Sequence, residues 1–262
     1  MPVSLQRHQP GQERKPPSDG NYASPAPDSA IPSARPLLIG LINNMPDAAL
    51  EATERQFISL LQAVSAEVQV HLSIYALPGV PRNETGAAYV KKFYASTDEL
   101  RHTRLDGLIV TGREPLAQNL AEEPYWHGFT QILEWAKDHT RSTVWSCLAA
   151  HAAVLYMDGI SRIRSSDKHF GIFACERVTD HMLTKNAPQP FLLPHSRWNG
   201  LPESALTKHG YSILTRTETG DVDSFLRHQN SHFVFFQGHP EYESNTLLLE
   251  YRRDVGRYIR GS

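Results

Sequence analysis

Short apolar runs alternate with helical segments through the middle of the chain, and this alternation constrains the fold more than any other feature. Continuously apolar runs at residues 37–42, 108–110 and 143–145 are typical of strands buried on both faces. Residues 50–61 and 126–139 carry apolar side chains at helical spacing. Strand, helix and strand in this order favour right-handed crossovers. The pattern therefore predicts an α/β fold, an open and mostly parallel sheet with helices on both faces.

The second half of the chain is less regular but continues the same domain. Residues 243–258 predict a terminal helix, and residues 191–200, rich in Pro, His and Asn, predict a functional loop. Period-two or compact apolar patterns predict further strands at residues 68–74, 211–214 and 233–236. We therefore expect one α/β domain over residues 36–262, with some antiparallel additions.

The N-terminal segment has a different composition. Residues 1–36 contain 8 of the 18 prolines, with Ser, Gln, Asp and Gly between them. A segment of this kind buries too little apolar surface to offset its ordering entropy. We therefore predict that residues 1–35 form a disordered Pro-rich tail.

Charge and hydropathy exclude several classes of protein. Lys and Arg total 26 and Asp and Glu total 28, so the net charge of −2 argues against a nucleic-acid partner. The sequence has no apolar run of about 18 residues and no signal-peptide pattern at its start, which argues against a membrane span or secretion. Two cysteines cannot form a disulfide framework, so we expect reduced thiols, a cytoplasmic location and no metal.

Cys147 ends the apolar strand at residues 143–145 and is followed by small and apolar residues that begin a helix. A cysteine at such a turn lies against the positive end of the helix dipole, which favours the thiolate. A buried structural cysteine is an equally good interpretation of this feature alone.

His239 and Glu241 follow another predicted strand end, at residues 233–236. A histidine there can take a proton from a thiol while a carboxylate two residues later orients the imidazole. The alternative is that His239 stabilises a turn and Glu241 begins the terminal helix. Cys147, His239 and Glu241 together predict a nucleophile, its base and the partner of that base.

Gly112 follows the strand at residues 108–110 and supplies the third strand end of interest. A glycine at this position lets backbone N–H groups, its own and that of Arg113, face a cleft as an oxyanion hole requires. The N–H of Leu148, directly after the nucleophile, is the natural second donor. Gly112 can also be an ordinary turn glycine.

Five motifs in one order give the sequence a family resemblance. They are residues 106–112 (DGLIVTG), the turn at Cys147, residues 167–171 (DKHFG), residues 194–197 (PHSR) and residues 238–242 (GHPEY). From about residue 36 to residue 258 the chain resembles the homoserine O-acyltransferases, the homoserine O-succinyltransferase family. That family has the flavodoxin-like, class I glutamine-amidotransferase-like fold.

The resemblance implies transfer of an acetyl or succinyl group from acyl-CoA to the hydroxyl of homoserine or serine, through a cysteine thioester. It implies the nucleophile and base already named, and it implies that Lys168, Ser196, Arg197 and Arg253 contact substrate. A guanidinium fork suits an α-carboxylate. The implied partners are small molecules, with acyl-CoA as co-substrate, no resident cofactor, no nucleic acid and no membrane. A homodimer is left open.

Departures from the family pattern leave parts of this interpretation open. Leu148 and His151 stand where the family commonly has Trp and Gln. His151 lies one turn from Cys147 and is a second candidate base, although a polar wall of the pocket is the favoured interpretation. Near Leu116 the family carries Glu for acetyl or Gly for succinyl donors, so the donor is undetermined. The sequence also stops at Ser262, short of the family's C-terminal extension.

Two other functions compete with the acyltransferase. A glutamine amidohydrolase uses Cys, His and Glu in the same chain order, but it usually has glycines around its nucleophile, where this chain has Trp145 and Ala149. A catalytically inactive homologue that binds an amino acid or acyl-CoA is the third hypothesis. The intact triad argues against that hypothesis.

Overall fold

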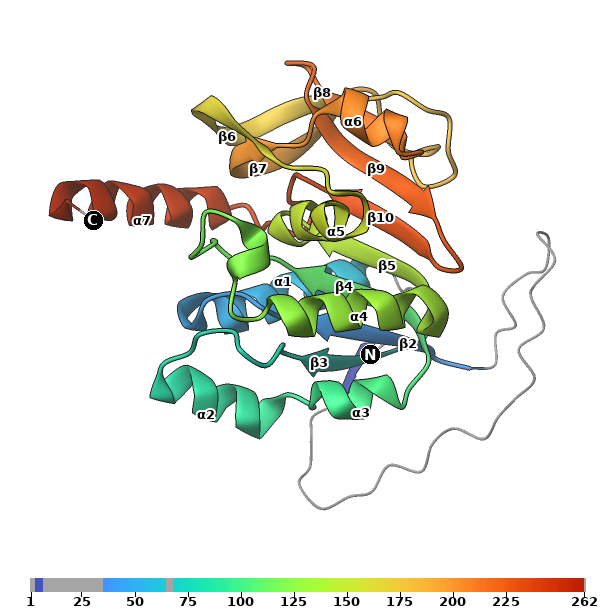
Figure 1. Ribbon diagram of the computed structural model, residues 1–262, viewed down its shortest axis with the longest axis vertical. Coiled ribbons are helices and arrows are strands. Elements are labelled where there is room, and N and C mark those ends of the chain that lie inside the picture. Colours follow the sequence, from blue (N-terminus) through green and yellow to red (C-terminus); the bar gives the residue numbers. More distant parts are fainter. Residues whose placement is uncertain (1–2, 7–34, 65–67, 262) are drawn as a thin grey trace.

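The computed structural model describes residues 3–6, 35–64 and 68–261, and its described residues form one ten-stranded mixed sheet (Figure 1). The order across the sheet is β1-β3-β2-β4-β5-β10-β9-β8-β6-β7. The strands are β1 (Val3–Gln6), β2 (Leu37–Ile42), β3 (Val70–Tyr75), β4 (Leu105–Thr111), β5 (Thr140–Ser146), β6 (Ile163–Arg177), β7 (Phe191–Gly200), β8 (Ser212–Thr217), β9 (Val222–His228) and β10 (His232–Phe236).

The half of the sheet from β1 to β10 is parallel throughout, which confirms the fold class. Its helices pack on both faces. The helices of the described residues are α1 (Leu50–Val64), α2 (Glu84–Phe93), α3 (Thr97–Arg101), α4 (Trp126–His139), α5 (Leu148–Asp158), α6 (Glu203–Lys208) and α7 (Thr246–Arg260), with short 3-10 helices at Asp47–Ala49 and Leu120–Glu122.

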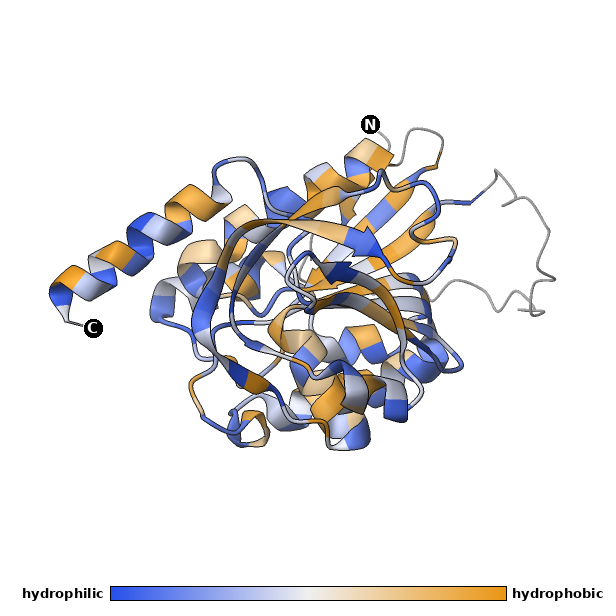
Figure 2. Ribbon diagram, turned by 90° about the horizontal axis from the view of Figure 1, so that it is seen from above, coloured by the Kyte–Doolittle hydropathy of each residue, from blue (hydrophilic) through white to orange (hydrophobic). Residues whose placement is uncertain are grey.

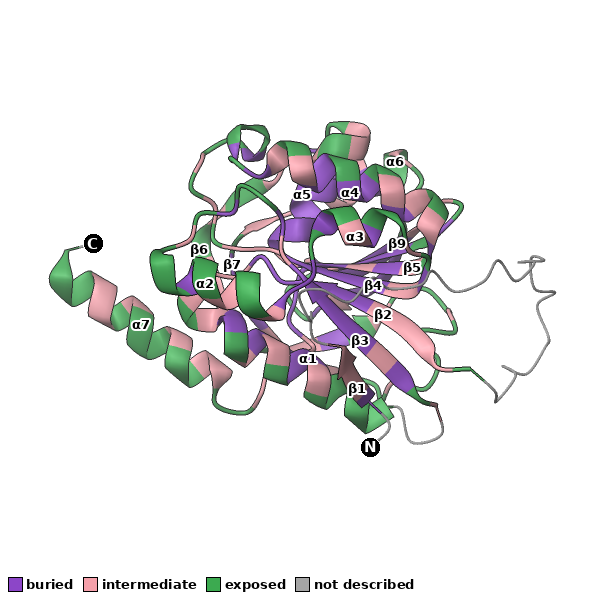
Figure 3. Ribbon diagram, turned by 90° about the horizontal axis from the view of Figure 1, so that it is seen from below, coloured by how far each residue is buried: buried purple, intermediate pink, exposed green. Residues whose placement is uncertain are grey.

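Successive residues of the central strands belong to opposite cores. Ile42 and Val110 pack into the core beneath α4 and α5, whereas Leu41 and Ile109 pack into the core beneath α1. Figure 3 shows the central strands buried between these layers. Because side chains alternate across a strand, a strand covered on both faces must be apolar at every position. This is why the apolar runs predicted β2, β4 and β5.

The half of the sheet from β10 to β7 is antiparallel, and it corrects one prediction. Residues 191–200 form strand β7, paired with β6, and not a loop. Leu193, His195 and Arg197 are buried on one side of β7 while the residues between them are more exposed. Two of these three buried positions are polar, so the alternation of a strand was hidden in the hydropathy pattern.

The prediction of a disordered tail is wrong at the start of the chain. Residues 3–6 form β1, which pairs in parallel with β3, with Val3 opposite Val70. Val3 and Leu5 alternate with polar residues, a pattern too short to stand out within the Pro-rich composition. Arg35, at the other end of the predicted tail, pairs with Asp106 at 2.7 Å. The prediction for residues 7–34 lies outside the described residues.

Helix α7 extends away from the body of the domain (Figure 1). None of its residues is buried, and Figure 2 shows hydrophobic and hydrophilic positions alternating along it. Among the described residues, no helix combines the length and apolar character needed to cross a lipid bilayer.

Candidate active site

Cys147 occupies a sharp turn between β5 and α5. Its backbone N–H donates to the carbonyl oxygen of Phe236 at the end of β10, at 2.8 Å. Cys147 has φ 53° and is the only non-glycine residue with positive φ among the described residues. Such a conformation costs on the order of 1–3 kcal/mol and persists only where the surroundings enforce it. The turn leaves the thiol partly exposed at the N-terminus of α5.

His239 and Glu241 come from the loop that follows β10, the strand next to β5. The Nδ1 atom of His239 lies 2.9 Å from Oε1 of Glu241, and Cys147 interacts electrostatically with the same imidazole. Only 8 % of His239 is exposed. The structure therefore brings together the three residues that sequence reasoning chose as nucleophile, base and partner.

The charges around His239 determine its protonation. Burial alone would lower the pKa of the imidazole, but the negative charges of Cys147 and Glu241 outweigh it, and the pKa is raised well above its usual value. An imidazole whose pKa is raised in this way accepts the proton of a neighbouring thiol more readily, as a cysteine nucleophile requires.

Gly112 lies directly against the nucleophile turn. A Cβ atom built on it would lie 2.5 Å from Cβ of Leu148 and 2.8 Å from the backbone nitrogen of Ala149. Only a residue without a side chain permits this approach. The strand end at Gly112 and the start of α5 therefore meet beside Cys147, where the predicted backbone N–H donors are needed. The Arg113 side chain points elsewhere, toward the carbonyl of Pro81.

His151, the second candidate base, is not suited to accept the thiol proton. Its Nε2 lies 2.9 Å from Oε1 of Gln237, and burial lowers its pKa to about 3. A base with so low a pKa has little driving force to take a thiol proton at neutral pH. His151 therefore forms part of the buried wall behind Cys147.

Arg197 lies on the buried side of β7, and one nitrogen of its guanidinium has no hydrogen-bond partner among the described residues. Its guanidinium donates to the carbonyl of Asn199 and to Nδ1 of His195, while Nη2 is buried with no hydrogen-bond partner among the described residues. Burial lowers the pKa of Arg197, an effect that the negative charges of Asp221 and Cys147 oppose. A buried guanidinium with a free donor near the nucleophile is suited to bind an anionic ligand.

His195 and Asp223 support the loop that carries the base. Nε2 of His195 lies 3.2 Å from Oδ1 of Asp223, both side chains are fully buried, and Gly238 packs against both. The backbone N–H of His239 donates to the carbonyl of Pro194 at 2.8 Å. This contact fixes the position of His239 from the side of β7.

Cys175, His195 and Asp223 also have potential metal-ligating atoms within 4.8 Å of one another. The guanidinium of Arg197 contacts the same histidine, and Gly238 lies so close that a Cβ atom built on it would be 2.7 Å from Oδ1 of Asp223 and 2.8 Å from Nε2 of His195. A cation at this place would meet a positive charge and a backbone segment. The group is therefore better explained as support for the base. Burial raises the pKa of the Cys175 thiol to about 12, which leaves it unreactive.

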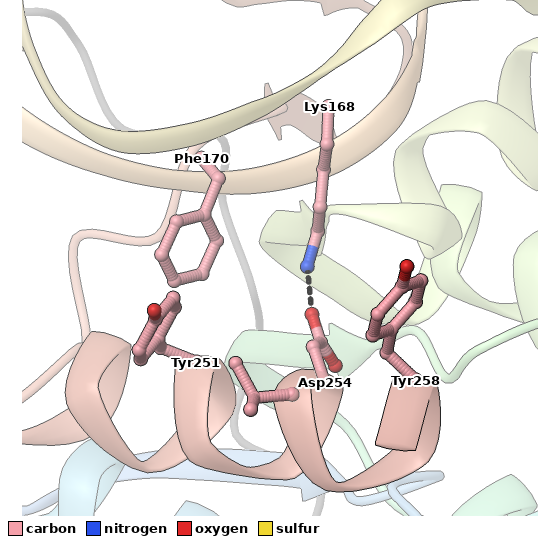
Figure 4. Close-up of a pocket in the computed structure, with 6 residues that line it drawn as sticks. Lys168, Phe170, Tyr251, Asp254 and Tyr258 are labelled. Atoms are coloured by element: carbon pink, nitrogen blue, oxygen red, sulfur yellow. Dashed lines mark hydrogen bonds and ion pairs between the residues drawn. The ribbon is translucent and has the colours of Figure 1, made fainter. Parts of the chain in front are cut away.

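Lys168, Ser196 and Arg253 lie on a second surface, formed by β6, β7 and α7. Nζ of Lys168 lies 2.5 Å from Oδ2 of Asp254, and Figure 4 shows this pair in a pocket of about 300 Å³. Ser196 is paired in register with Phe170, so by strand alternation it lies on the opposite side of β7 from Arg197. Arg253 pairs with Asp254 and its side chain is 45 % exposed.

Sequence reasoning assigned no role to Tyr242 or Glu250, which link this surface to the base. The Tyr242 ring stacks on His239 with centroids 4.2 Å apart, and its hydroxyl donates to Oε1 of Glu250 at 3.0 Å. Glu250 lies 3.7 Å from Arg253. Tyr242 belongs to the GHPEY motif at residues 238–242, and this motif could have identified it as a site residue. Glu250 lies on a helix face that no local pattern marks.

Known proteins resemble the chain in sequence over most of its length. A family model described as homoserine O-succinyltransferase matches residues 23–261. The homoserine O-succinyltransferase of Rhodopseudomonas palustris is 51 % identical over 90 % of this chain and 71 % of its own. The homoserine O-succinyltransferase of Bradyrhizobium japonicum is 47 % identical over 86 % and 70 %.

Solved structures resemble the fold at much lower sequence identity. A glutamine amidotransferase of Thermotoga maritima has TM-score 0.56 and 13 % identity, covering 86 % of both chains. A putative GMP synthase protein of Thermoplasma acidophilum has TM-score 0.53 and 16 % identity, covering 85 % of this chain and 98 % of its own. At these identities the likeness concerns the glutamine-amidotransferase-like fold alone.

Proposed function

The chain belongs to the homoserine O-succinyltransferase family and is an enzyme of that kind, and we propose that it transfers a succinyl group from succinyl-CoA to the hydroxyl of homoserine through a thioester on Cys147. One observation carries the mechanism. The nucleophile turn at Cys147 and the ion pair of His239 with Glu241 stand on adjacent strand ends, and Cys147 and Glu241 both act to raise the pKa of the imidazole.

The first half-reaction acylates the enzyme. His239 takes the thiol proton, and the Cys147 thiolate attacks the thioester carbonyl of the donor. Backbone N–H groups at Gly112, Arg113 and Leu148 stabilise the negative oxygen of the tetrahedral intermediate. The imidazolium then returns the proton to the departing CoA sulfur, which leaves the acyl group on Cys147. Glu241 stabilises the charged imidazole while it holds the proton.

The second half-reaction transfers the acyl group to the acceptor. His239 takes the proton of the acceptor hydroxyl, the oxygen attacks the Cys147 thioester, and the proton passes to the departing sulfur. The buried Nη2 donor of Arg197 supports a role in binding the α-carboxylate of the amino acid. Lys168, Ser196 and Arg253 are proposed to contact substrate from the surface along α7.

Small molecules are the partners that this chemistry requires. Acyl-CoA serves as co-substrate and no resident cofactor enters the mechanism, because every step is a proton or acyl transfer. A cytoplasmic location and a homodimer remain predictions.

Intact-protein mass spectrometry tests the proposal. Mixed with succinyl-CoA, the protein should gain one succinyl group, and homoserine should then remove it and yield O-succinylhomoserine. Cys147→Ala should abolish the adduct, whereas Cys175→Ala, at the buried cysteine, should keep it. An adduct on Cys147→Ala would contradict the assignment of the nucleophile. Glutamate release from glutamine would mark an amidohydrolase instead, and no reaction with either substrate would mark a binding protein.

A further inference from the structure

Arg162 lies between the end of the nucleophile's helix and the loop at residues 113–118. It follows α5 and directly precedes β6, and its side chain is partly buried. Its Nη2 atom donates to the carbonyl of Gln118 at 3.3 Å. The guanidinium forms no ion pair with a carboxylate of the described residues. Most of its five N–H donors are therefore available to a ligand.

The loop that Arg162 contacts begins at the oxyanion hole and is held in place. Gly112 packs against Leu148 at one end. Farther along, Oε1 of the buried Glu123 accepts hydrogen bonds from the N–H groups of Leu116 at 2.6 Å and Ala117 at 2.8 Å. The loop thus runs from the carbonyl-binding position beside Cys147 to the guanidinium of Arg162.

The electrostatic surroundings of Arg162 agree with this placement. Burial lowers the pKa of its guanidinium, while the nearby Glu123 carboxylate acts in the opposite direction. A partly buried cation that forms no ion pair is unfavourable, and an anion bound beside it would offset that cost. Arg113, the other arginine of this region, instead donates to the carbonyls of Pro81 and Glu114.

We propose that Arg162 binds the distal carboxylate of a dicarboxylic acyl group, such as succinyl, while that group is attached to Cys147. With the thioester oxygen at Gly112 and Leu148, the acyl chain extends along the loop, so its far end meets Arg162. Arg197 lies on β7 and remains for the α-carboxylate of the acceptor. Arg162 is therefore the residue that favours succinyl over uncharged donors, an inference that rests on the proposed function.

The test compares two donors of equal chain length, succinyl-CoA and butyryl-CoA, which carries a methyl group in place of the carboxylate. The rate of thioester formation is measured in single turnovers by mass spectrometry. Arg162→Gln should slow succinylation at least about tenfold, the loss expected for a charge-assisted pair. It should leave butyrylation within about threefold of the wild type, which also reports correct folding. Arg164→Gln is the matched control, because Arg164 is exposed and stacks over Trp198.

Each outcome has one meaning. Loss of succinylation alone in Arg162→Gln supports the inference. Equal slowing with both donors, or no slowing with either, overturns it while the wild-type adduct leaves the proposed function intact. If Arg164→Gln shifts the donor preference as strongly, the preference comes from the general positive charge and the inference fails. A wild-type protein that forms no adduct with either donor overturns the proposed function itself, and this inference with it.

Discussion

Replacing Gly112 by alanine should uncouple the oxyanion hole from the nucleophile. The new Cβ atom would lie 2.5 Å from Cβ of Leu148 and 2.8 Å from both the Leu148 Cα and the Ala149 nitrogen. Carbon atoms normally approach no closer than about 3.5 Å, so the loop must move about 1 Å from the turn. A displacement of about 1 Å can cost about a hundredfold in rate, and loss of one oxyanion donor costs about 10²–10³-fold. Gly112→Ala should therefore slow thioester formation from succinyl-CoA at least about a hundredfold.

Two measurements separate this effect from general damage. Alkylation of Cys147 by iodoacetamide passes through no oxyanion, so its rate should stay within about threefold of the wild type. Gly128→Ala is the matched control, because its Cβ would meet its nearest neighbours at 3.7 Å, an ordinary contact, and it should acylate normally. If Gly112→Ala acylates at the wild-type rate, the oxyanion donors do not lie at this contact. If alkylation falls as steeply as acylation, the substitution has disturbed the nucleophile and not the hole.

Three further predictions concern the groups around Cys147. Arg197→Gln should keep the rate of thioester formation within about threefold of the wild type but raise the KM for homoserine at least about tenfold, because one charge-assisted pair is lost. Slower acylation with an unchanged KM for homoserine would instead mean that Arg197 binds the acyl donor. His151→Gln should retain turnover within about threefold, because the pKa of His151 near 3 keeps it neutral, whereas His239→Gln should abolish turnover; equal losses in both would make His151 part of the proton transfer. Glu241→Gln removes one of the negative charges that raise the pKa of His239, so this pKa should fall. In an NMR titration the imidazolium should then lose its proton at a lower pH than in the wild type. An unchanged titration would mean that Cys147 alone raises the pKa of His239.

The sequence predicted the elements that are buried on both faces and missed those whose buried positions are polar. Strands β2, β4, β5 and β10 carry uninterrupted apolar runs, and these are the strands of the central sheet. Strand β9 has Asp223 and Ser224 fully or almost fully buried, and β7 has His195 and Arg197. Polar side chains at buried positions interrupt the apolar alternation, so no local hydropathy pattern marks either strand.

The site residues also divide into those that a local sequence pattern marks and those that it does not. Cys147, His239 and Glu241 were found because strand ends are recognisable from the chain, and parallel strand ends meet at one edge of a sheet. Arg162 and Glu250 had no such signal. Their proximity to Cys147 and Tyr242 depends on how α5, the loop at residues 113–118 and α7 pack. The family resemblance supplied Arg197 and Arg253, but it did not indicate that they lie in such different surroundings.

The hydrogen bond between the Cys147 N–H and the Phe236 carbonyl gives the nucleophile and the base a common reference point. Strands β5 and β10 are neighbours, about 4.8 Å apart, so the turn at Cys147 and the loop that carries His239 leave the sheet from adjacent strand ends, although long stretches of chain separate them. The chain between them, from α5 to β9, supplies the antiparallel strands of the same sheet and contacts the base at the Pro194 carbonyl of β7. Insertions and exchanges in the parts of this segment that do not contact the loop at His239 can therefore change which molecules are accepted while the reacting atoms keep their separation, so selectivity and chemistry can change independently in this architecture.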